Sequence, residues 1–147
     1  MRILDICSAK VESISLHASA RDAAGKMYES HVGTLVVVAH NEARPIGILT
    51  DRDLVLKVLA KGTSAEAVSV ADVMTREVAT CKDGQNLFDV VQIMHRYGVR
   101  RLPVVNDDGA AIGLICADDI YSALATHMRE LSQAMLREQV QEMESSL

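Results

Sequence analysis

A chain of 147 residues is long enough for one ordinary domain or for two very small ones. Its hydrophobic share of 49% and its charged share of 24% allow a packed core and exclude a disordered chain. Aromatic residues make up only 3% and the formal net charge is −5, which disfavours base stacking and attraction to nucleic acids or anionic membranes. The N-terminus has no apolar signal-peptide core and no stretch approaches the roughly 20 apolar residues of a membrane span, so we expect a cytoplasmic protein.

The first half of the chain predicts a β-α-β-β-α unit. Its expected elements are a lead-in at residues 3–8, a short strand at 11–16, a helix from Ser19 to about Gly33, strands at 35–39 and 46–49 around a turn at 41–45, and a helix at 51–60. Ser19 is a good N-cap, and a glycine near a helix end is typical of a C-terminus. The near-continuous apolar strands indicate a sheet covered on both faces, and the polar turn between them favours a hairpin.

The second half repeats this order. Its expected elements are a lead-in at residues 70–75, a short strand at 78–81, a helix from about Gln85 to near Gly98, strands at 102–105 and 111–115 around a turn at 106–109, and a helix from Asp118 onward. A shift of 67 residues places Asp5 on Asp72, and a shift of 66 after the turn places Asp53 on Asp119. Each half is too short to bury a large core alone, so we expect two small units packed face to face. The expected boundaries are 1–62 and 63–126 for the units and 127–147 for a tail.

The tail is expected to continue the last helix, because the chain has no glycine or proline after Gly113. Its apolar residues recur at steps of three, four and five, which is typical of an amphipathic helix. They are Leu124, Met128, Leu131, Met135, Val140, Met143 and Leu147. Such a helix can pack back on the protein's own body, or it can face a partner or a second copy. The sequence leaves both possibilities open.

The repeated pattern resembles the paired cystathionine-β-synthase (CBS) domains, also called a Bateman module. The stretches that carry the resemblance are 72–75 leading into 78–80, 31–38 with its counterpart 97–105, and 47–53 with its counterpart 113–119. The resemblance covers residues 1 to about 126 and implies a stand-alone α/β (α+β) protein. It also implies two units packed with pseudo-two-fold symmetry, and a homodimer formed through the helices.

In that family, the pattern Gly-x-x-Thr/Ser-x-x-Asp resembles a nucleotide site: the acid accepts the ribose hydroxyls, the hydroxyl touches phosphate, and the base lies in an apolar cleft between units. Thr50 and Asp53 match in full. Asp119 matches, but Cys116 stands in place of the hydroxyl, and a thiol is a weak donor, so the first site is the better candidate. The expected nucleotide-binding residues are Ser13, Thr50, Asp53, Thr80, Arg100, Arg101 and Asp119.

Five of these residues also have a purely structural interpretation. Thr50 can be a helix cap, Asp53 and Asp119 can be first-turn carboxylates that suit the helix dipole, and the two arginines can be solvated. Arg100 and Arg101 are nevertheless suited to bidentate phosphate contact and are the basic pair beside the expected cleft.

Two further classes of site find no support in the sequence. The five histidines and three cysteines are scattered without metal-ligand spacing, so no metal is expected. No nucleophile–base pair can be proposed, so we do not expect an enzyme. The leading hypothesis is a regulatory module that binds AMP or ATP, possibly NAD, and passes the bound state to an unknown protein target. The alternative is a homo-oligomeric scaffold with vestigial nucleotide sites that acts through its C-terminal helix.

Overall fold

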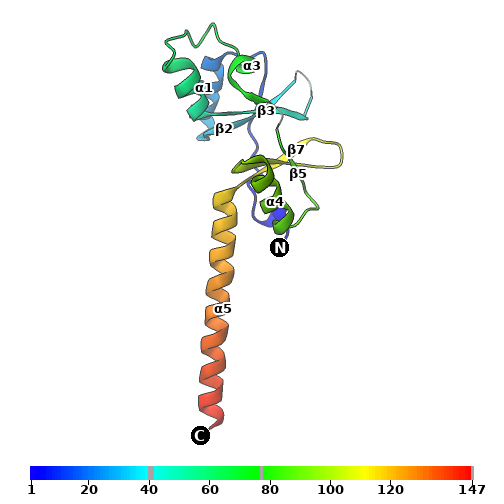
Figure 1. The fold of residues 1–147 in the computed structure, drawn as a ribbon, viewed down its shortest axis with the longest axis vertical. Coiled ribbons are helices and arrows are strands. Elements are labelled where there is room, and N and C mark those ends of the chain that lie inside the picture. Colours follow the sequence, from blue (N-terminus) through cyan, green and yellow to red (C-terminus); the bar gives the residue numbers. More distant parts are fainter. Residues whose placement is uncertain (40–41, 77, 147) are drawn as a thin grey trace.

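The computed structural model describes residues 1–39, 42–76 and 78–146 of the chain. It contains two small α/β units and a long helix that extends away from both of them (Figure 1). Asn41 of the first predicted turn and Leu147 of the predicted tail lie outside the described residues. The elements are η1 (Ile3–Asp5), β1 (Ser13–Ser15), α1 (Ala20–Ser30), β2 (Thr34–Val38), β3 (Pro45–Thr50), α2 (Asp51–Leu54), η2 (Val55–Leu59), α3 (Val70–Val73), β4 (Thr75–Arg76), β5 (Cys81–Lys82), α4 (Leu87–Tyr97), β6 (Arg101–Val105), β7 (Ala111–Cys116) and α5 (Ala117–Ser145).

Each unit has its own sheet, and the two sheets are built alike. The first has the order β1-β2-β3-β4 and the second the order β5-β6-β7. In each, the first strand pairs parallel to the second, and the second and third strands form the predicted antiparallel hairpin. Both hairpins carry a register shift at the same place, between Val37 and Val38 and between Val104 and Val105. The internal repeat is therefore confirmed down to this irregularity.

The helices that follow the short strands begin at capping boxes. Ser19 caps α1 together with Asp22, as predicted, and Asn86 caps α4 together with Asp89. Helix α4 ends at Gly98 in the left-handed conformation, with φ of 63°. The equivalent left-handed residue of α1 is His31, with φ of 56°, so Gly33 lies beyond the helix end.

Some predicted elements are shorter or different in the structure. The helix expected at residues 51–60 is one α-helical turn, α2, followed by the π-helical segment η2. The strand expected at 78–81 is reduced to β5, so that Thr80 immediately precedes it. The second lead-in forms α3 and β4.

The two lead-ins pack on opposite units. Ile3 is fully buried in the core of the second unit with Leu102 and Ile115. Val70 and Val73, from the second lead-in, are buried in the core of the first unit. Bridges from Arg2 to Asn86 and from Ser8 to Leu114, together with the pairing of β4 with β3, join the same segments through the backbone. The units are thus interlinked, and the boundaries at residues 62 and 126 remain predictions drawn from the sequence repeat.

A close approach of the second lead-in explains the glycine of the first strand–helix motif. A Cβ atom added to Gly47 would lie 2.6 Å from Met74 Sδ and 3.0 Å from the carbonyl oxygen of Thr75. We expect Gly47→Ala to lower the free energy of unfolding by about 1–3 kcal/mol through overpacking, measured by urea denaturation. Gly25→Ala is the matched control, because Gly25 lies within α1 with nothing within 4 Å. Gly25→Ala should stabilise the protein by about 0.5–1 kcal/mol. An equal effect of the two substitutions would show that the close approach of the second lead-in to Gly47 is not the cause.

Helix α5 does not fold back on the protein's own body. Ile120 is its buried residue, and the apolar side chains beyond it are exposed. Exposed fractions of Met128, Leu131 and Met143 are 70%, 65% and 70%. None of the helices in the described residues is long and apolar enough to cross a membrane.

Candidate functional site

The first strand–helix junction is a capping box. The side-chain oxygen of Thr50 accepts the Asp53 N–H at 3.2 Å, and Asp53 Oδ2 accepts the Thr50 N–H at 2.9 Å. The predicted N-cap role of Thr50 is therefore confirmed. Asp51 lies beside the end of the loop that connects α1 to β2, because its N–H donates to the Gly33 carbonyl at 2.9 Å.

Asp53 has a second partner that the sequence analysis missed. Lys57 Nζ lies 3.2 Å from Asp53 Oδ1, and the same ammonium donates to the carbonyl oxygen of Val73 at 2.9 Å. Both oxygens of this carboxylate are therefore engaged within the chain. The spacing of four residues was a signal for the pair, because residues at i and i+4 are neighbours on a helix surface.

The second junction has the same kind of cap, but its carboxylate has different neighbours. Asp119 Oδ2 accepts the Cys116 N–H at 2.9 Å. Ala123 stands where the repeat places the counterpart of Lys57. Within the described residues, the structure gives Asp119 no ion pair.

The predicted arginines lie at this second junction. Arg101 pairs across the sheet with Cys116, and the Arg100 carbonyl accepts the Ala117 N–H at 2.8 Å. Burial raises the pKa of the Cys116 thiol, as does Asp119, while the Arg101 guanidinium acts to lower it. A hollow of about 20 Å³ is lined by Arg100, Arg101, Cys116, Ala117 and Asp118. The exposed arginines thus border a strand–helix junction with a carboxylate in its first turn.

A larger cavity lies between the two units, next to the first junction. Its volume is about 200 Å³. The first unit contributes Val11, Val32 and Thr34, and the other wall includes Leu114 of β7. Thr34 pairs across the sheet with Thr50, so this cavity of mixed lining, which also includes Lys10 and Glu12, opens beside the cap of α2. Its position agrees with a cleft between the units.

The structure does not gather all seven predicted residues into one place. Thr50 and Asp53 lie at one junction, and Arg100, Arg101 and Asp119 at the other. Ser13 lies in β1, where its carbonyl oxygen accepts the ammonium of Lys26. Thr80 lines a separate open cavity of about 630 Å³ with residues of α4.

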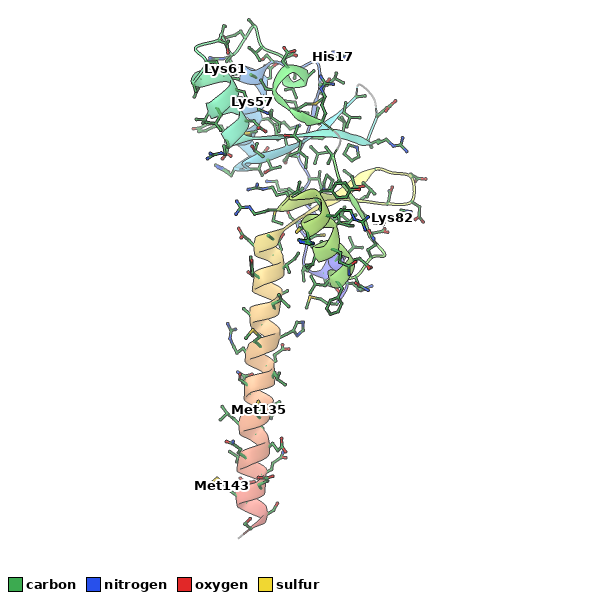
Figure 2. The ribbon with its side chains drawn as sticks, viewed as in Figure 1. His17, Lys57, Lys61, Lys82, Met135 and Met143 are labelled. Atoms are coloured by element: carbon green, nitrogen blue, oxygen red, sulfur yellow. The ribbon has the colours of Figure 1, made fainter. Side chains whose placement is uncertain are left out.

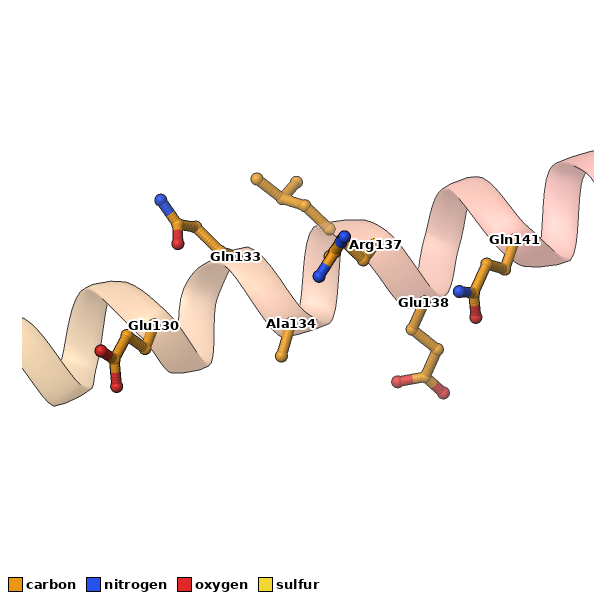
Figure 3. A pocket seen from close by; sticks show the side chains of 7 residues that line it. Glu130, Gln133, Ala134, Arg137, Glu138 and Gln141 are labelled. Atoms are coloured by element: carbon orange, nitrogen blue, oxygen red, sulfur yellow. The ribbon is translucent and has the colours of Figure 1, made fainter.

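Two other features of the structure do not form a binding or catalytic site. A hollow of about 750 Å³ runs along α5, but all its lining residues come from that single helix, including Glu130, Arg137 and Gln141 (Figure 3). One helix cannot enclose a ligand, so we interpret this hollow as open helix surface. Within residues 1–39, 42–76 and 78–146, no group of three or more His, Cys, Asp or Glu side chains could hold a metal ion. Burial raises the pKa of Cys81 to about 11, which leaves its thiol protonated near neutral pH.

The comparisons with known proteins agree on the repeat. A family model described as "CBS domain" matches twice, over residues 3–60 and 70–126. An uncharacterized protein of Methanopyrus kandleri is 38% identical over 102 residues, which is 69% of this chain and 52% of that protein. The chain thus spans about half the length of this curated relative.

Two solved structures have the same fold. The CBS domain pair of protein MJ0100, solved with 5-methylthioadenosine and S-adenosyl-L-methionine, has a TM-score of 0.74 at 24% identity and covers 86% of this chain and 98% of that one. A CBS domain protein from Pyrobaculum aerophilum, solved with AMP, has a TM-score of 0.73 at 22% identity and covers 86% and 99%.

Proposed function

Because this chain belongs to the CBS domain family, we propose that it is a non-enzymatic regulatory module that binds an adenine nucleotide between its two units. AMP and ATP are the favoured ligands, and NAD is a further candidate. Ligand occupancy would be passed to a separate protein target. Two structural neighbours with CBS domains were solved with adenosine ligands, which supports this proposal.

The observation that carries the proposal is the duplicated strand–helix junction. Each copy places a carboxylate three residues after the end of a strand, at Asp53 and at Asp119. A carboxylate has enough acceptor capacity for the two hydroxyls of a ribose. The apolar part of the cavity beside Thr34, from Val11, Val32 and Leu114, suits a base, and Arg100 and Arg101 at the second junction suit a phosphate.

The neighbours' ligands support adenosine as the shared chemistry. AMP, 5-methylthioadenosine and S-adenosyl-L-methionine have the adenosine moiety in common and differ at the 5′ position. We infer that base and ribose recognition comes from the fold, whereas recognition of the 5′ group depends on the residues of each chain. In this chain those residues are Thr50 at one junction and Arg100 and Arg101 at the other.

Transmission would follow from linkage. The cavity is lined from both units, so a ligand bound there touches both. A ligand that binds one relative arrangement of the units more tightly shifts the population toward that arrangement. The interlinked lead-ins give such a shift a covalent route, since α3 and β4 connect the first core to the second unit.

Isothermal titration tests this function. Protein stripped of ligand by denaturation and refolding is titrated with AMP, ADP, ATP and NAD, with GMP as the control for the base. We expect saturable heat with at least one adenine nucleotide and none with GMP at the same concentration. No heat from any adenine nucleotide, with the protein well above micromolar concentration, would overturn the proposal.

A second function is favoured by the exposed tail. Helix α5 presents Leu124, Met128, Leu131 and Met135 along one side, all exposed. An isolated helix with such a face is only marginally stable in water, and packing against a partner is the usual remedy. We propose that a second copy of the chain covers this stripe in a homodimer. The module would then act as an assembly protein as well as a sensor.

A further inference from the structure

We infer that Lys57 is a built-in competitor for the ribose at the first junction, and that the second junction lacks such a competitor. This inference rests on the proposed function, because it concerns the two carboxylates to which a ribose would bind. Its basis is the ion pair between Lys57 and Asp53, which has no counterpart at Asp119 within the described residues.

The first step is the occupancy of the Asp53 carboxylate. Oδ2 holds the backbone N–H of Thr50, and Oδ1 faces the Lys57 ammonium at 3.2 Å. The Asp53 side chain is only 17% exposed and that of Lys57 39%, so water screens this pair less than a surface pair. The Thr50 N–H and the Lys57 ammonium leave one acceptor position on each oxygen, so a ribose hydroxyl that binds Oδ1 competes with the ammonium for that oxygen.

The second step is that Lys57 is held from both sides. Its ammonium also donates to the Val73 carbonyl at 2.9 Å, at the end of α3 in the second lead-in. Displacing Lys57 therefore loses a charge-assisted hydrogen bond in addition to the ion pair. Figure 2 labels Lys57 on the helical segment η2 of the first unit, and Lys61 in the turn that follows it.

The third step is the contrast with the second junction. Ala123 occupies the position of Lys57, and among the described residues Asp119 accepts the Cys116 N–H without an ion pair. Ala117 also replaces Asp51, and Asp118, which lines the hollow with the two arginines, replaces Arg52. At the second junction, Asp119 has no ion pair within the described residues and two arginines lie at the same junction. At the first junction, the cavity is larger, but Asp53 is paired with Lys57.

The test isolates each junction and then exchanges the lysine. Asp119→Asn disables the second carboxylate, and Asp53→Asn the first, while the amide oxygen can still accept the cap N–H. In the Asp119→Asn background, Lys57→Ala should tighten AMP binding about tenfold, because the ion pair and the hydrogen bond no longer compete. In the Asp53→Asn background, Ala123→Lys should weaken AMP binding by a similar factor.

The controls carry the same change of charge without reaching either acid. Lys61→Ala removes an exposed lysine one turn beyond Lys57, and Thr126→Lys adds one a turn beyond residue 123. Both should leave the dissociation constant for AMP unchanged in their backgrounds. Unchanged or weaker AMP binding on Lys57→Ala would overturn the inference alone. No AMP binding by the unmodified chain or any variant would overturn the proposed function, and the inference with it.

Discussion

Ile3→Ala should destabilise the second unit by about 2–5 kcal/mol, although Ile3 lies in the first half of the sequence. The Ile3 side chain is fully buried beside Leu102 and Ile115. Truncating a fully buried isoleucine loses its transfer free energy and leaves a cavity in the core. Urea denaturation would give the change in the free energy of unfolding.

Hydrogen exchange would locate the effect. Amides of β6, β7 and α4 should lose protection in Ile3→Ala before those of β2 and β3 do, because the lost contacts belong to the second core. Leu4→Ala is the matched control, since Leu4 is 47% exposed and should cost less than about 0.5 kcal/mol. If both substitutions had equally small effects, or if protection fell in the first unit instead, the exchange of lead-ins would be contradicted.

Leu131→Glu should convert a homodimer into a monomer. Leu131 lies within the exposed stripe on α5, in the 3–4 spacing that helix pairing requires. Ala125, Ser132 and Ala134, which lie beside the stripe, are small and uncharged, and His127 and Glu138 also border it. A glutamate in the middle of the stripe would face its own copy or be buried without a partner.

The measurement is the molar mass by sedimentation or light scattering. Gln133→Glu is the control, because it adds the same charge on the opposite side of the helix, away from the stripe. The unmodified chain and Gln133→Glu should have twice the mass of Leu131→Glu at the same concentration. A monomeric unmodified chain, or a dimer that survives Leu131→Glu, would show that a second copy does not cover the stripe. Figure 2 labels Met135 and Met143 on the part of α5 that extends away from both units.

The sequence predicted those parts of the fold that depend on local chemistry. The repeat predicted both hairpins, and the side chain of Ser19 predicted the start of α1. Gly98 predicted the end of α4, because a left-handed residue at that position favours glycine. His31 adopts the same conformation without being glycine, which local propensity did not indicate.

The exchange of lead-ins could not be predicted from the repeat. A lead-in at the same position in both copies fits either core in an alignment, and only tertiary packing decides between them. The glycines of the two motifs are consistent with the exchange of lead-ins. A Cβ atom at Gly47 or at Gly113 would collide with the other unit's lead-in. A residue pattern shows that a glycine is present but does not show which segment approaches it.

The sequence predicted which residues belong to the candidate site, but it did not predict how they are arranged. The sequence indicated that the two junctions differ, through Cys116 in place of a hydroxyl, and ranked the first higher. The structure adds a difference of another kind, because Lys57 engages Asp53 while Asp119 has no equivalent cation within the described residues. The hydroxyl of Thr50 favours the first junction, whereas the carboxylate of Asp119, which has no ion pair in the described part of the chain, favours the second. Nucleotide binding must therefore be measured at each junction alone.

Equilibrium dialysis with radiolabelled AMP tests the central claim most directly. It compares the stripped chain with the variant that carries both Asp53→Asn and Asp119→Asn. We expect saturable AMP binding by the unmodified chain, and binding at least tenfold weaker in the double variant, whose helix caps remain intact. Equal AMP binding by the two proteins would contradict the assignment of the ribose to these carboxylates and, with it, the placement of the nucleotide at the strand–helix junctions.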